Sequence, residues 1–141
     1  KEHLTEELLD RLLASASIEQ YLDEGLVSAR TLTDYLFDRM EAHDLRRADV
    51  VRASGLNATV VYDIFSGKSR PGRDHAIMLA FGLKCTLRET QRLLRLAGVS
   101  ELWCKQRRDA IIIWCIRNGF DRIATDDELY RMGEATLLPA D

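Results

Sequence analysis

The chain has 141 residues, of which 46% are apolar and 30% charged, a composition typical of a globular protein that buries a core without disulfides. Three cysteines, Cys85, Cys104 and Cys115, form no CxxC pair, so we expect reduced thiols in a cytoplasmic protein rather than a disulfide framework. The longest apolar run, 110–116, is too short to cross a bilayer, and no signal-peptide pattern opens the chain, so we expect no membrane association.

The net charge of -3 conceals an uneven distribution along the chain. Residues 1–45 carry 4 basic and 11 acidic side chains, a balance of -7. Residues 46–108 carry 13 basic and 5 acidic side chains, a balance of +8, and residues 109–141 carry 3 and 7, a balance of -4. A basic middle between acidic flanks indicates a polyanionic partner for the central segment.

Apolar residues recur at helical spacing along nearly the whole chain. We expect helices over 5–14, 17–24, 32–41, 47–54, 58–66, 73–83, 86–98, 106–118 and 125–132. No segment alternates with a period of two, so the pattern predicts an all-α fold. We find no internal repeat.

Local sequence signals set several of these helix boundaries. Gly25 and Gly55 are expected to end helices, and Asn57 to cap the one that follows. Two segments match the capping box, in which a Thr hydroxyl and a Glu carboxylate satisfy each other's backbone amides. They are Thr86–Glu89 and Thr125–Glu128, and we expect each to open a helix.

The helices 47–54 and 58–66 are short and separated by three residues that include a glycine, which is typical of a helix-turn-helix. Gly55 can adopt the positive φ that such a sharp turn demands. The residues expected to lock the pair together are Val50, Val51, Leu56, Val61 and Ile64. The second helix then presents Ala58, Thr59, Tyr62 and Asp63 outward.

Three stretches, "SGLNATVVYDIFSGKSRP", "LAFGL" and "TLRETQRLLRLAGV", together resemble the phage-repressor-like (XRE/Cro) helix-turn-helix DNA-binding family. The resemblance spans about 32–99 and implies a five-helix core. It gives three parts: an N-terminal helical extension over 1–30, a DNA-binding domain over 31–99, and a C-terminal helical extension over 100–141 that packs on the core or on a dimer partner.

The resemblance also implies a set of DNA contacts, with the helix 58–66 in the major groove. Base contacts would fall on Ala58, Thr59, Tyr62 and Asp63. Arg47 would clamp a phosphate and brace this helix, and Asn57, Lys68, Ser69 and Arg70 would contact the DNA backbone. Independently of the family, Lys68, Arg70 and Arg73 place positive charge beside the helix N-terminus, where free amides bind phosphate.

We therefore expect a DNA-binding transcriptional regulator that needs no metal or cofactor. A homodimer is possible because a single module buries little DNA surface, and the run 110–116 is apolar on more than one helix face. No catalytic motif is present, so we expect no enzyme; Gly67-Lys68-Ser69 lacks the rest of a phosphate-binding loop.

The alternative is a protein-interaction module without sequence-specific DNA binding. Apart from Asn57, the outward face offers none of the side chains that make bidentate base contacts.

Overall fold

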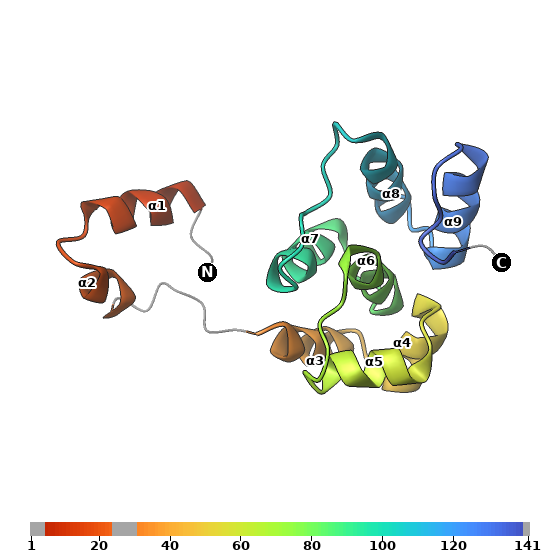
Figure 1. Ribbon diagram of the computed structural model, residues 1–141, viewed down its shortest axis with the longest axis horizontal. Helices are drawn as coiled ribbons and strands as arrows, with labels where there is room; N and C mark the ends of the chain where they lie inside the picture. Colours follow the sequence, from red (N-terminus) through yellow and green to blue (C-terminus); the bar gives the residue numbers. More distant parts are fainter. Residues whose placement is uncertain (1–4, 24–30, 140–141) are drawn as a thin grey trace. The chain divides into compact units, whose positions relative to one another are not determined.

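The computed structural model describes residues 5–23 and 31–139, and it contains nine helices and no strands within them (Figure 1). The prediction of an all-α protein is thus confirmed. The chain divides into two compact units, residues 1–30 and residues 31–141. The second unit therefore unites the two segments, 31–99 and 100–141, that the sequence analysis separates.

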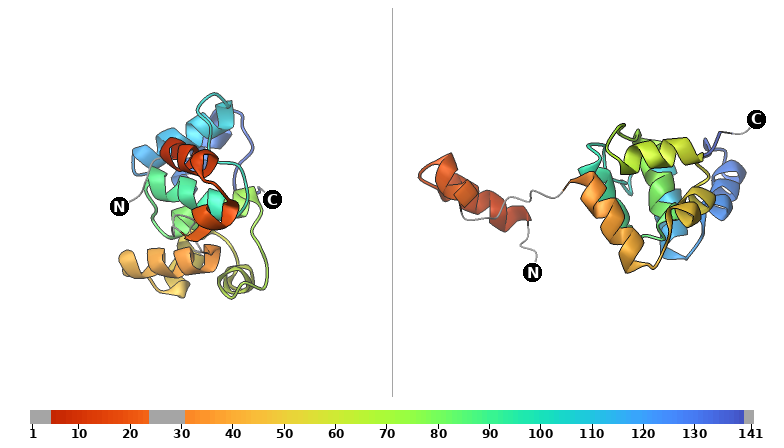
Figure 2. Two further views of the ribbon diagram at one scale, coloured as in Figure 1. Left: turned by 90° about the vertical axis from the view of Figure 1, so that its left-hand side faces the viewer. Right: turned by 90° about the horizontal axis from the view of Figure 1, so that it is seen from below.

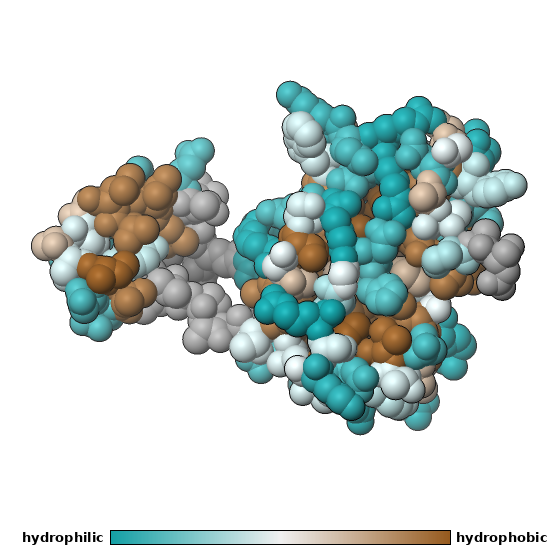
Figure 3. All heavy atoms as spheres, in the orientation of Figure 1, coloured by the Kyte–Doolittle hydropathy of each residue, from teal (hydrophilic) through white to brown (hydrophobic). Residues whose placement is uncertain are grey.

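The first unit contains two short helices, α1 (Thr5–Ala14) and α2 (Ile18–Asp23). The Ser17 hydroxyl accepts a hydrogen bond of 3.1 Å from the Gln20 amide, which caps α2. Too few residues are present to bury the leucines of α1, and Leu13 is 74% exposed. Apolar side chains accordingly cover much of the visible face of this pair (Figure 3). The expected helix end at Gly25 lies outside the described residues.

The second unit begins with five helices around a common core. They are α3 (Leu32–Ala42), α4 (Arg47–Ser54), α5 (Ala58–Phe65), α6 (Arg73–Gly82) and α7 (Leu87–Leu96). Helix α6 is the central element, because six of its ten residues are buried and α4 and α7 both pack against it. The capping box at Thr86 and Glu89 is confirmed, with amide-to-oxygen distances of 2.9 and 3.2 Å.

The last two helices, α8 (Arg107–Arg117) and α9 (Arg122–Arg131), share this core. Ile112 and Leu129 are fully buried in it, whereas Trp114 on the other side of α8 is 54% exposed. The run 110–116 therefore supplies one buried face and one open face within this unit.

The predicted capping box at Thr125 and Glu128 is wrong. Helix α9 begins three residues earlier, where the Asp121 carboxylate accepts a 2.8 Å hydrogen bond from the Ala124 amide. Gly119, at a φ of 75°, forms the turn between α8 and α9. Asp121 comes after this turn, so it is in place to cap α9. Thr125 lies inside the helix and is fully buried.

Helices α8 and α9 repeat α6 and α7, so the statement that the sequence holds no internal repeat is also wrong. Residues 73–102 align without a gap onto residues 108–137. Seven pairs are identical: Arg73/Arg108, Asp74/Asp109, Ile77/Ile112, Thr90/Thr125, Leu94/Leu129, Gly98/Gly133 and Leu102/Leu137. Identity is low, but five of the seven other buried apolar positions of the first repeat keep an apolar residue in the second.

The contacts between the two repeats are reciprocal. Arg73 pairs with Asp109 through two hydrogen bonds of 3.0 and 2.6 Å, and Arg108 pairs with Asp74 through two of 2.9 and 3.0 Å. Each arginine also donates to two successive carbonyls after the second helix of its own repeat, at residues 100 and 101 or 135 and 136. An interface in which each partner contributes the same residues defines an approximate two-fold axis.

Candidate nucleic-acid interface

The turn between α4 and α5 is built by three residues with separate tasks. Gly55 adopts a φ of 82°, as predicted, and its amide donates to the Val51 carbonyl at 3.3 Å, which ends α4. Leu56 is buried beneath the turn, and its amide donates to the Ser54 hydroxyl at 3.2 Å. Asn57 caps α5, because its side-chain oxygen accepts from the Val60 amide at 2.9 Å. The turn is fixed by its own residues on the outer side.

On its inner side the turn rests on Arg122 of α9. A β-carbon at Gly55 would lie 2.6 Å from the Arg122 Nε atom, so a larger residue would have to displace the Arg122 side chain in addition to adopting the positive φ. The Arg122 guanidinium is held by Asp126 at 2.6 Å, and the Asp126 carboxylate accepts from the Leu137 and Leu138 amides. Sequence reasoning missed Arg122; the repeat could have drawn attention to it, because it is the counterpart of the apolar Leu87.

Helix α5 buries one side and exposes the other. Val61, Ile64 and Phe65 are buried in the core. Three of the four residues predicted to contact bases, Ala58, Thr59 and Tyr62, are exposed, and the fourth, Asp63, is half-buried. The helix lies along the lower edge of the second unit in Figure 1 and is seen end-on in the left view of Figure 2.

Arg47 and Tyr62 are brought together by the crossing of α4 and α5. The Arg47 guanidinium carbon lies 5.2 Å from the centre of the Tyr62 ring, which is cation–π geometry. Arg47 stays exposed, so its planar donors remain able to reach an anion. Arg46, the N-cap residue of α4, is exposed beside it and was not among the predicted contact residues.

The loop after α5 presents its backbone and side chains outward. The Asp63 carbonyl accepts from the amides of Lys68 and Ser69 at 2.9 and 3.2 Å, which folds the loop back onto α5. Lys68 and Ser69 are exposed. Arg70 is also exposed, but its guanidinium donates to the Ala97 carbonyl at 3.0 Å and ties the loop to the end of α7.

Among the predicted contact residues, Arg73 is the one that makes the most hydrogen bonds within the fold. Its guanidinium makes four hydrogen bonds, two to the buried Asp109 carboxylate and two to the carbonyls of Ser100 and Glu101. Few donors are left for a phosphate, so we leave Arg73 out of the candidate interface. The helical pattern of residues 73–83 could not reveal this partner, which lies 36 residues further along the chain.

Other kinds of site find little support in the part of the chain that the structure describes. Within it, no three His, Cys, Asp or Glu residues are grouped so that they could hold a metal ion. None of its helices has the length and apolar character needed to cross a membrane. Burial, with a further contribution from Glu89, raises the pKa of the Cys85 thiol to about 12, so this cysteine is a poor nucleophile.

Comparisons with known proteins found no match among family models, curated proteins or solved structures.

Proposed function

We propose that α4 and α5 form a helix-turn-helix of the phage-repressor type within the five-helix core α3–α7, and that the protein is a DNA-binding transcriptional regulator. The observation that supports this most is the arrangement around α5. Its outer face is exposed at Ala58, Thr59 and Tyr62, the Arg47 guanidinium lies over the Tyr62 ring, and the exposed Lys68 follows in the loop after the helix. A helix exposed in this way can enter the major groove.

Phosphate contacts supply most of the binding free energy in this proposal. The Ala58 and Thr59 amides at the start of α5 have no acceptor within the helix, and at its positive end they can bind a phosphate. The next amide, that of Val60, is already bound by the Asn57 side chain. Arg46 and Arg47 at the start of α4, and Lys68 and Ser69 in the loop after α5, are exposed and can contact neighbouring phosphates. Arg70 contributes through its charge while its guanidinium remains anchored to Ala97.

Base contacts are few, so sequence preference rests partly on DNA shape. Thr59 and Tyr62 can each donate one hydrogen bond to a base, and Ala58 can contact a thymine methyl group. Asp63 can accept a hydrogen bond from a cytosine amino group, although it repels phosphate. The Asn57 side-chain oxygen caps α5 and is committed to that role.

The proposal is tested by the salt dependence of binding to a labelled duplex, followed by fluorescence anisotropy. Each lost phosphate contact should reduce the slope of log affinity against log salt by about 0.9. We expect this change for Arg47→Ala and for Lys68→Ala. Arg117→Ala is the matched control, because Arg117 is an exposed cation at the end of α8, outside the α4–α5 pair.

The protein-interaction alternative is favoured by the lack of long polar side chains on the outward face of α5. In that case Tyr62, which is 45% exposed, would contact a protein instead of a base. A folded protein that binds no duplex at low salt would reject the proposed function and leave this alternative.

A further inference from the structure

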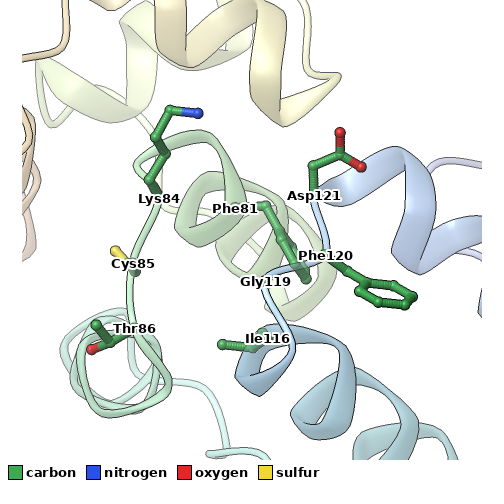
Figure 4. A pocket seen from close by; sticks show the side chains of 8 residues that line it. All are labelled: Phe81, Lys84, Cys85, Thr86, Ile116, Gly119, Phe120 and Asp121. Atoms are coloured by element: carbon green, nitrogen blue, oxygen red, sulfur yellow. The ribbon is translucent and has the colours of Figure 1, made fainter.

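A hollow of about 380 Å³ lies where the two repeats meet, and none of its lining residues belongs to α4 or α5 (Figure 4). Small-molecule sites in proteins have volumes of about 300–1,000 Å³. The end of α6 and the turn that follows it form one wall, with Phe81, Lys84, Cys85 and Thr86. The opposite wall is formed by the end of α8 and its following turn.

The second wall consists of the repeat counterparts of the first. Ile116, Gly119, Phe120 and Asp121 correspond one by one to the four residues of the first wall. The hollow therefore lies on the approximate two-fold axis between the repeats. Equivalent positions carry different chemistry, however. Gly119 opens space opposite Lys84, and a β-carbon added to Gly119 would meet no atom within 4 Å.

The middle of the hollow is apolar and uncharged. Phe81 and Ile116 line it from the two sides, and Phe120 is fixed by an edge-on contact with Trp114 at 5.3 Å between ring centres. The Cys85 thiol, whose pKa is raised to about 12 mainly by burial, stays neutral. This part suits an aliphatic or aromatic side chain.

One end of the hollow carries two opposite charges, Lys84 and Asp121 (Figure 4). Both side chains are exposed, and within the described residues neither has an ion-pair partner, including the other. Their positions are set by the backbone. Lys84 occupies a turn at a φ of 56°, and Asp121 caps α9 with one carboxylate oxygen. The second oxygen remains available to a ligand.

We propose that this hollow binds a free α-amino acid with an apolar side chain. Its carboxylate would pair with the Lys84 ammonium, its ammonium with the Asp121 carboxylate, and its side chain would lie between Phe81 and Ile116. The match follows from charge complementarity. A ligand with one charge leaves either Lys84 or Asp121 without a partner, and a zwitterion leaves neither.

The site is connected to the α4–α5 turn by sequence adjacency. Asp121 immediately precedes Arg122, whose side chain lies against Gly55. A ligand that moves Asp121 therefore displaces the residue on which the turn rests. This transmission makes the amino acid an effector of DNA binding, and only this part of the inference depends on the proposed function.

Binding is tested without DNA, by titrating isotope-labelled protein with L-leucine and following the backbone amide signals. We expect saturable shifts at residues 81–86 and 116–121, and at Gly55. Two matched compounds separate the charges: 4-methylpentanoate lacks the ammonium group, and 3-methylbutylamine lacks the carboxylate. Each should bind about fivefold more weakly than L-leucine, the loss expected for one partly exposed ion pair.

Two variants assign each charge to its partner. Lys84→Gln should weaken binding of L-leucine and the acid but leave the amine unaffected. Asp121→Asn should weaken binding of L-leucine and the amine but leave the acid unaffected; asparagine also caps helices, so α9 is retained. Lys105→Gln and Asp127→Asn, two exposed positions outside the hollow, are the controls.

Three results would overturn the inference. Absence of saturable shifts at millimolar L-leucine would reject the site. Equal affinity for L-leucine and both matched compounds would reject the two-charge recognition. Shifts around the hollow without one at Gly55 would reject the transmission. A failure of DNA binding would instead reject the proposed function and would not change any of these signals.

Discussion

The α6–α7 and α8–α9 repeats have the same fold in different surroundings. Of the residues that are identical in both, Ile77 and Ile112 fill the core, the two arginines join one repeat to the other, and Gly98 and Gly133 each form a turn at a φ of 77°. The residues that differ face different neighbours. Leu87 packs on the core in the first repeat, and its counterpart Arg122 supports the α4–α5 turn in the second. The two helix pairs thus share the contacts within and between the repeats and differ in their contacts with the rest of the protein.

The clearest difference is at the end of the first helix of each repeat. A β-carbon on Gly82 would lie 2.9 Å from both the Ser54 side chain and the Val50 carbonyl, because α4 crosses α6 there. The counterpart of Gly82 is Arg117, which is exposed, so none of the helices in the described residues covers α8 at that point. The first repeat is therefore the one that carries the proposed helix-turn-helix, and the second supports it from the side of the turn.

The largest predicted effect on stability comes from removing either arginine of the two reciprocal ion pairs, and we expect Arg73 to matter more than Arg108. Asp109 is only 4% exposed, whereas Asp74 is 41% exposed. Arg73→Met leaves a buried carboxylate without its cation and should cost about 3–5 kcal/mol of unfolding free energy. Arg108→Met leaves a carboxylate that water can reach and should cost about 1–2 kcal/mol. Urea denaturation of both variants measures the difference.

A double variant checks the cause of that difference. Arg73→Met combined with Asp109→Leu removes the buried charge together with its partner, and it should recover part of the stability lost by Arg73→Met alone. Equal losses for Arg73→Met and Arg108→Met would mean that the two halves of the repeat interface do not differ as their exposure indicates.

The second prediction concerns Glu89, whose repeat counterpart is Ala124. Burial would raise the pKa of the Glu89 carboxyl, but the Thr86 amide, His43 and Arg39 outweigh it and hold the pKa below its ordinary value of 4.5. A depressed pKa stabilises the fold above the ordinary value, and this contribution is lost as the pH falls through the lowered one. Glu89→Gln should therefore lower the unfolding free energy by about 1–2 kcal/mol at pH 7.

The gap between the wild-type protein and Glu89→Gln should close as the pH falls below 4.5, because the wild-type carboxyl then takes up a proton. Ala124→Gln is the control in the second repeat. It removes no charge, so any change in its stability should be independent of pH. Chemical denaturation of both variants from pH 7 to pH 3 provides the measurement, and a gap that persists at low pH would contradict the assignment.

Local features of the fold were predictable from the sequence because short-range geometry determines them. Gly55, Asn57 and the Thr86–Glu89 capping box each act within four residues, and each has the predicted conformation or hydrogen bond. The start of α9 could not be predicted in this way. Asp121 and Thr125 are both favourable N-cap residues, and only the tertiary fold buries Thr125 inside the helix. Helix positions were thus more predictable than the choice between neighbouring caps.

Long-range pairings could not be derived from helical spacing. The pattern around Arg73 indicates an exposed cation at a helix start, and nothing nearby in the sequence points to Asp109. Arg122 poses the same problem, since its partners are a turn 67 residues earlier and a carboxylate one helical turn later. The repeat was the available clue, because Arg73 and Asp74 recur together as Arg108 and Asp109. Arg47 was expected to clamp a phosphate and brace the helix 58–66, and Tyr62 to face outward, but the contact of Arg47 with the Tyr62 ring was not predicted.

The smallest predicted effect compares Thr90 with its counterpart Thr125, two threonines that are equally buried. The Thr90 hydroxyl donates to the Thr86 carbonyl at 2.8 Å. The Thr125 hydroxyl has no hydrogen-bond partner of normal geometry among the described residues, and its polar neighbour, the Cys115 thiol, bonds only weakly. A buried hydroxyl that has lost its water without gaining a partner destabilises the fold.

Replacement by valine keeps the shape of the side chain and removes the hydroxyl, so it isolates this difference. Thr90→Val should cost about 1 kcal/mol because it removes a satisfied hydrogen bond. Thr125→Val should change the unfolding free energy by less than about 0.5 kcal/mol or increase it, because no bond is lost and an unsatisfied polar group is removed. The two variants can be compared by urea denaturation at one pH. A loss for Thr125→Val as large as that for Thr90→Val would show that the Thr125 hydroxyl has a partner in solution, and that the two repeats are more alike in their cores than these contacts indicate.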